Sequence, residues 1–175
     1  MLKAARFDGA TFLELRDDIT STGQAFGVLT LVSLTYGIGF AAVNAVELGG
    51  LSPAEFMLGI LTSMIWFLVT IFVWSITAFL VGTKLFRGVT TFKGLLRPIF
   101  FSTAPGLLFV LMVIPFSLVS QAIAALAWFW IIVAGVFAVK NAMGFSTLLG
   151  MLTFIIYVFI FYLLGPGIFL SFVPR

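Results

Sequence analysis

The chain contains no cysteine and no histidine, and only 9% of its 175 residues are charged. Without cysteine there is no thiolate nucleophile and no disulfide. Without histidine there is no imidazole to act as a general base or to ligate haem, chlorophyll or a metal ion. These absences predict a protein that is not an enzyme and that binds no cofactor.

Charge is scarce because the chain is apolar, with 62% hydrophobic residues and a mean hydropathy of +1.27. A soluble domain carries about 25% charged residues. This chain therefore has too little polar surface for water, and its composition predicts an all-α integral membrane protein. We expect a single membrane domain over residues 1–175, with no soluble domain attached.

The carboxylates lie outside the apolar stretches, at Asp8, Glu14, Asp17, Asp18, Glu47 and Glu55. Proton- and ion-coupled carriers usually keep an ionisable group inside the helix bundle. The sequence therefore disfavours a self-contained secondary transporter. A channel or transporter component stays open as an alternative, with a polar path through Asn44, Thr62, Ser75, Thr77 and Gln121.

Four uncharged stretches, 19–46, 56–83, 98–139 and 141–174, divide the chain. A helix needs about 20 apolar residues to cross the hydrocarbon core, so the third stretch has room for two helices. Pro115 is expected to mark the turn between them, and Gly165-Pro166-Gly167 to end the last helix. The predicted spans are 24–45, 57–81, 99–114, 121–139 and 145–164.

The nine basic residues are distributed unevenly about these five spans. Eight of them fall on the N-terminal side of the membrane: Lys3, Arg6, Arg16, Lys84, Arg87, Lys93, Arg97 and Lys140. Arg175 falls on the other side. Basic loops stay cytoplasmic, which predicts an N-in, C-out orientation. Bases spread along membrane edges also argue against a nucleic-acid partner.

The N-terminal arm, residues 1–19, is amphipathic at helical spacing. Phe12, Leu15 and Ile19 fall on one face, whereas Glu14 and Asp17 fall on the other. This pattern predicts a short interfacial helix in the plane of the membrane. Docking to a partner, or packing on the cytoplasmic face of the bundle itself, are the alternatives.

In residues 82–97, basic and apolar residues alternate between glycines. We expect a cytoplasmic loop that is re-entrant or lies in the membrane plane. Its four bases, Lys84, Arg87, Lys93 and Arg97, are expected to contact lipid phosphates.

Small residues recur every four positions in the first span, at Ser33, Gly37, Ala41 and Ala45. Such a stripe lets another helix approach closely. The expected neighbour is a helix of the same chain, and a partner protein is the alternative.

Four tryptophans, Trp66, Trp74, Trp128 and Trp130, lie deeper in the spans than an interfacial belt would place them. They are typical of ordinary apolar packing. The alternative is a groove for a lipid, a quinone or a pigment.

Four segments resemble the Yip-domain family, whose eukaryotic members are named for binding Ypt/Rab GTPases. They are FLELRDD at 12–18, GTKLF at 82–86, LLR at 95–97 with STAPG at 102–106, and the run from Trp130 to VKNA at 139–142. In order and spacing they cover about residues 5–160 and are most similar to the prokaryotic branch. The resemblance implies five helices, a cytoplasmic N-terminus, and roles in membrane organisation, traffic or scaffolding.

The resulting hypothesis is a non-enzymatic scaffold, adaptor or accessory subunit of a larger membrane complex. Its expected partners are membrane lipids and other membrane proteins. In a prokaryote it would lie in the cytoplasmic (inner) membrane. The alternatives are a channel or transporter component, or a subunit that holds a lipid, quinone or pigment.

Overall fold

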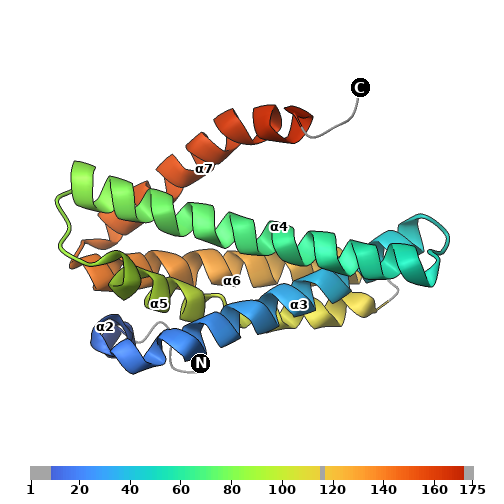
Figure 1. Cartoon of the computed structure of the whole chain (residues 1–175), viewed down its shortest axis with the longest axis horizontal. Helices are drawn as coiled ribbons and strands as arrows, with labels where there is room; N and C mark the ends of the chain where they lie inside the picture. Colours follow the sequence, from blue (N-terminus) through green and yellow to red (C-terminus); the bar gives the residue numbers. More distant parts are fainter. Residues whose placement is uncertain (1–8, 115–116, 172–175) are drawn as a thin grey trace.

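The computed structural model describes residues 9–114 and 117–171, and every regular element within these ranges is helical (Figure 1). This confirms the all-α prediction for the described residues. In chain order the elements are α2 (Gly9–Asp17), the 3₁₀ turn η1 (Ile19–Ser21), α3 (Thr22–Glu47), α4 (Pro53–Leu80), the π-helical η2 (Val81–Leu85), α5 (Phe92–Ser102), the 3₁₀ helix η3 (Ala104–Val113), α6 (Ser117–Met143) and α7 (Thr147–Ser171).

Four of these helical stretches are long and apolar enough to cross a membrane: Ile19–Glu47, Pro53–Leu85, Phe92–Val113 and Leu118–Met143. Within α7, Thr147–Phe161 forms a shorter apolar helical stretch. Lys3, Arg6, Pro115 and Arg175, to which the sequence assigned roles in topology, lie outside the described residues.

The third span, α5 followed by η3, is the centre of the bundle. It packs against α3 on one side and α6 on the other. In its apolar window 72% of the residues are buried, whereas only 11% are buried in the window of α4. Figure 1 shows α4 along the outside and α7 diverging from the bundle towards its C-terminal end.

Aromatic rings fill the space between the third span and its neighbours. Tyr36 of α3 lies 5.0 Å from Phe109 of η3 and 5.1 Å from Phe67 of α4. Trp128 of α6 lies 5.6 Å from Phe67 and 5.7 Å from Phe109. The Tyr36–Phe109 and Phe109–Trp128 pairs are edge-to-face, an arrangement that adds about 0.5–1.5 kcal/mol beyond area burial. The cluster therefore ties four helices together.

The third span begins earlier than the predicted 99–114, at Phe92, and it changes helix type near Pro105. Pro105 has no N–H to donate, so one hydrogen bond of the α-helical ladder is missing there. The backbone switches to shorter-range hydrogen bonds, from Thr103 N to Phe100 O at 3.2 Å and from Gly106 N to Thr103 O at 2.7 Å. A 3₁₀ helix rises about 2 Å per residue, so ten residues of η3 cover about 20 Å.

Two other boundaries also differ from those predicted. The second span continues beyond 81 as η2 to Leu85, so only residues 86–91 separate it from α5. The last helix was expected to end at Gly165-Pro166-Gly167, but α7 runs through these residues to Ser171. In an apolar solvent a helix is the one way to pair the backbone within the segment, so glycine and proline end helices less readily.

We predict that Gly39→Ala lowers the thermal stability of the purified protein. A Cβ at Gly39 would collide with the backbone carbonyl oxygen of Phe109, at the contact between α3 and η3. Overpacking of this kind costs about 1–3 kcal/mol. Thermal unfolding in detergent should therefore show a clear fall in Tm.

Gly27→Ala is the matched control, since nothing lies within 4 Å of a Cβ at Gly27 in the same helix. It should leave Tm unchanged or raise it, because alanine favours helix over glycine. Equal Tm values for the two variants would show that the close approach at Gly39 is not required.

Candidate functional site

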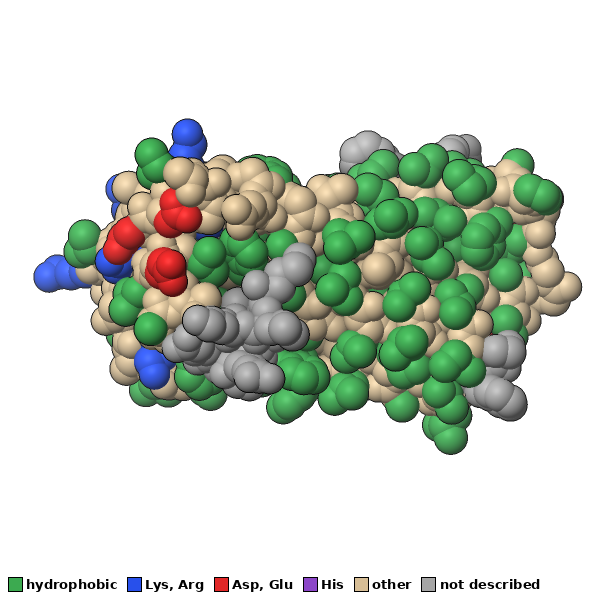
Figure 2. Space-filling model, turned by 90° about the horizontal axis from the view of Figure 1, so that it is seen from below, with side chains coloured by type: hydrophobic (Ala, Val, Ile, Leu, Met, Phe, Trp, Pro, Cys, Tyr) green, Lys and Arg blue, Asp and Glu red, His purple; other side chains and the backbone are tan. Residues whose placement is uncertain are grey.

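The described basic residues gather at one end of the bundle. They are Arg16, Lys84, Arg87, Lys93, Arg97 and Lys140. This end comprises α2, the α4–α5 connection and the α6–α7 connection, at the left of Figure 1. Figure 2 shows the charged side chains on that face gathered at the same end, with hydrophobic side chains over the rest. We call it the charged end.

Glycines allow the segments of the charged end to approach closely. A Cβ at Gly9 in α2 would lie 3.0 Å from the Asn141 side-chain oxygen in α6. Gly82 and Gly88, in η2 and the loop after it, lie against Met143 and Phe145 of the α6–α7 connection. Glu47 and Glu55 flank the α3–α4 connection at the opposite end.

The arm packs on the bundle through α2, which contacts α5 and α6. Phe12 is completely buried and Leu15 packs against the core. Ile19, expected on the same face, is 76% exposed. The reason is that α2 ends at Asp17 and Asp18 caps the separate turn η1, which rotates Ile19 away.

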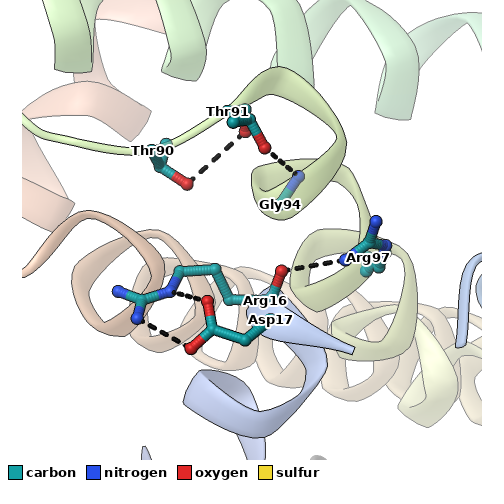
Figure 3. A network of polar contacts seen from close by, with 6 residues as sticks. All are labelled: Arg16, Asp17, Thr90, Thr91, Gly94 and Arg97. Carbon is teal, nitrogen blue, oxygen red and sulfur yellow. Dashed lines mark hydrogen bonds and ion pairs between the residues drawn. The ribbon is translucent and has the colours of Figure 1, made fainter. Parts of the chain in front are cut away.

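Arg97 fastens the arm to the bundle (Figure 3). Its Nη1 donates to the backbone oxygen of Arg16 at 2.9 Å, and its Nε donates to Thr22 Oγ1 at 2.8 Å. Arg16 lies in the last turn of α2, where helix carbonyls lack partners and a cation is favourable. Arg97 thus caps the arm helix and ties it to the middle of α5 and the start of α3.

This arrangement differs from the predicted role of Arg97 in a basic loop. Lys93 and Arg97 lie on α5 rather than in a loop, and Arg97 is only 5% exposed. The helix starts at Thr91, whose Oγ1 accepts a hydrogen bond from Gly94 N at 3.1 Å (Figure 3). A Cβ at Gly94 would lie 3.3 Å from Arg16 Cγ, so glycine makes room for the arm.

The acids at the end of α2 have partners of their own. Asp17 accepts from the Arg16 guanidinium at 2.8 and 2.9 Å, and this hydrogen bond lowers the Asp17 pKa below its ordinary value. The pKa of Asp18 is lowered chiefly by the hydrogen bond from the Thr20 hydroxyl. The Arg16–Asp17 pair is exposed, so it adds little stability.

The other basic residues of the charged end differ in their environments. Lys84, Arg87 and Lys93 are exposed, and within the described ranges none of them forms an ion pair. Arg87 has a left-handed backbone, φ 57°, a conformation that normally favours glycine. Lys140 donates to Thr147 Oγ1 at 3.0 Å and lies 5.3 Å from the Phe137 ring centre. The sequence pattern around Lys140 does not indicate this tie between α6 and α7.

The small-residue stripe of α3 faces the protein's own α4. A Cβ at Gly37 would lie 2.6 Å from the Ile60 carbonyl oxygen, and Gly59 lies against Ala41. Ser33 is fully buried, whereas Ala45 is partly exposed. These contacts use the stripe for packing within one chain.

The tryptophans lie in different aromatic clusters. Trp74 packs on Phe154 and Tyr157 of α7, and Trp66 lies 5.9 Å from Phe161 of the same helix. Trp128 belongs instead to the Tyr36 cluster, and Trp130 is partly buried. Trp74 Nε1 is a buried donor without a partner among the described residues.

The polar residues of the predicted path do not line one continuous route. Thr62 donates to Leu58 O at 2.9 Å, and Ser75 donates to Ile71 O at 2.8 Å, so both hydroxyls bond to their own helix. Asn44 and Gln121 do share a cavity of about 230 Å³ between α3, η3 and α6, away from the charged end.

A family model of the Yip1 domain matches residues 7–168, from the arm into α7. No curated protein and no solved structure matches the chain significantly.

We predict that Arg97→Gln exposes the arm to trypsin. The variant removes the hydrogen bond from the Arg97 guanidinium to Arg16 O, worth about 1.5–3 kcal/mol, so the opening equilibrium of α2 should rise at least about ten-fold. In detergent-solubilised protein, cleavage after Arg16 should accelerate accordingly, as measured by the mass of the truncated chain.

Lys84→Gln is the control, because it also removes one charge from the charged end while Lys84 is exposed. Equal cleavage rates in the two variants would show that Arg97 does not hold the arm.

Proposed function

Because the chain belongs to the Yip1 domain family of integral membrane proteins, we propose that it acts without catalysis. In this proposal it is a scaffold, adaptor or accessory subunit that binds other membrane proteins. In a prokaryote it would do so in the cytoplasmic membrane.

The observation that carries this proposal is the uncovered side of α4 and α7. The exposed apolar residues of α4 recur at helical spacing along its length, at Leu58, Leu61, Ile65, Val69, Ile76 and Leu80. Those of α7 do the same, at Leu148, Met151, Ile155 and Phe159. Trp66, 44% exposed, lies where α4 meets α7. Because α7 diverges from the bundle (Figure 1), these two stripes offer an incomplete helix layer on which a partner helix can pack.

We further propose five spans with an N-in, C-out orientation. The length of α7, 25 residues, supports a fifth span. The described bases at the charged end support a cytoplasmic location for that end. In this proposal the exposed Lys84, Arg87 and Lys93 contact headgroup phosphates.

The absence of cysteine makes this orientation directly testable. Val89→Cys lies in the α4–α5 loop, where Val89 is 85% exposed, and Leu48→Cys lies in the α3–α4 connection, where Leu48 is 71% exposed. An impermeant maleimide added to sealed, right-side-out vesicles should label Leu48→Cys and not Val89→Cys. Arg175→Cys should behave like Leu48→Cys if α7 crosses.

The unsubstituted chain serves as the blank in this experiment. Labelling of Val89→Cys from outside would reverse the orientation. Protection of Arg175→Cys with labelling of Leu48→Cys would remove the fifth span.

Partner binding is tested by purifying the tagged chain in a gentle detergent and identifying co-purifying proteins by mass spectrometry. We expect a stoichiometric set of membrane proteins. Leu61→Trp adds bulk to the α4 stripe and should reduce their recovery about ten-fold, since a disrupted central contact costs about 1–2 kcal/mol.

Phe129→Trp is the control, because Phe129 is 66% exposed on α6, away from the stripe. It should leave recovery unchanged. Isolation of the chain alone, as a monomer or homo-oligomer, would contradict the proposal.

A further inference from the structure

A groove of about 180 Å³ lies between the start of α3 and α5, at the charged end. Its floor consists of the buried residues Ala25, Leu96 and Phe100. Phe26 of α3 and Phe92 of α5 form its partly exposed walls. The groove is therefore an apolar depression in the surface formed by α3 and α5.

The walls of the groove are held in place by aromatic contacts. The Phe26 ring meets the Phe100 ring edge-on at 5.1 Å, and Phe92 meets Phe79 of α4 at 5.4 Å. Phe100 is supported in turn by Phe72 at 5.2 Å. Because these rings are packed from behind, the groove is formed before any ligand arrives.

Two bases border the groove, one turn apart on the same face of α5. Arg97 is engaged by the arm through Nη1, which donates to Arg16 O, and by α3 through Nε, which donates to Thr22 Oγ1. Lys93 is exposed, and the described residues provide no ion-pair partner for it. Two acids at the end of α2 are engaged elsewhere, Asp17 by Arg16 and Asp18 by Thr20. Lys93 thus brings an uncompensated positive charge to the mouth of an apolar groove.

We propose that this groove binds one phospholipid from the leaflet at the charged end. An acyl chain lies along Phe26, Leu96 and Phe100, and the phosphate diester meets the Lys93 ammonium. The ligand must combine an anionic group with an apolar tail, because the lining is apolar while the charge sits at the rim. A free phosphate would leave the aromatic channel unused.

The position of the groove matches this occupant. Thr22 and Phe92, which both line it, begin the membrane spans α3 and α5. The start of a span is the level at which headgroup phosphates give way to acyl chains. Lys84 and Arg87 are exposed at the same end but do not line the groove, so they contact lipid phosphates without an acyl site.

The test is native mass spectrometry of the full chain in detergent, titrated with phosphatidylglycerol. One bound lipid should persist at collision energies that strip the others. Lys93→Gln should weaken this binding about five-fold, the effect expected for one lysine at a lipid surface. Lys93→Arg should restore it. Lys84→Gln, which removes an equal charge outside the groove, should change it by less than about two-fold.

The acyl contact is tested separately. Phe26→Ala removes one wall and should weaken phosphatidylglycerol without changing the weak binding of glycerol phosphate. Leu31→Ala is the control, since Leu31 is 45% exposed on the same helix and outside the groove.

Three outcomes would overturn the proposal. Equal losses for Lys93→Gln and Lys84→Gln would mean diffuse electrostatic attraction. Glycerol phosphate binding as tightly as the lipid would mean an anion site alone. Diacylglycerol binding as tightly as phosphatidylglycerol would mean an apolar groove with no role for Lys93. None of these outcomes depends on whether partner proteins co-purify.

Discussion

The hydrocarbon core of a bilayer offers no water to an unpaired N–H, O–H or C=O, and the described helices are arranged around this constraint. Hydroxyl groups return to their own helix: Ser102 donates to Ile99 O at 2.6 Å, and Thr153 donates to Gly150 O at 2.7 Å. The same requirement explains the third span, which changes to 3₁₀ hydrogen bonding at Pro105 and stays helical. The backbone can alter its helix type at such a point, but it cannot leave the helix unless it lies within protein.

Arg97 is the one charged side chain that is buried among the described residues. Like the buried hydroxyl groups it needs hydrogen-bond partners, but it finds them on other helices. A guanidinium cannot be neutralised, so burial requires acceptors for its N–H groups. A carbonyl at the end of α2 and the Thr22 hydroxyl provide them. The arm is thus part of the solution to a buried charge. Its position follows from electrostatics as much as from the apolar contacts of Phe12.

Charge and hydropathy were sufficient to predict the helical membrane class and the approximate extents of the first, second and fourth helices. The predictions that were wrong concern residues whose position depends on tertiary contacts. Arg97 was read as a loop base, although Thr91 followed by Gly94 could have indicated a helix start there. Ile19 was assigned to the buried face because the sequence does not reveal the break at Asp18. Gly165-Pro166-Gly167 was read by the rules of soluble proteins, which weaken where no water can pair with a freed backbone group.

Whether the arm can detach depends mainly on Arg97. Phe12 could exchange its protein contacts for lipid, so its burial resists release only weakly. Arg97 would lose its charge-assisted hydrogen bond to the Arg16 carbonyl oxygen, worth at least about 1.5 kcal/mol, which corresponds to an open fraction below about 10%. Lipid phosphates cannot replace the lost hydrogen bond before the arm detaches, because Arg97 is only 5% exposed while the arm is docked. A partner that approaches the charged end therefore meets the arm already docked. It must recognise the outward face of α2, where Glu14 and Asp17 are exposed, beside the bases of the α4–α5 connection.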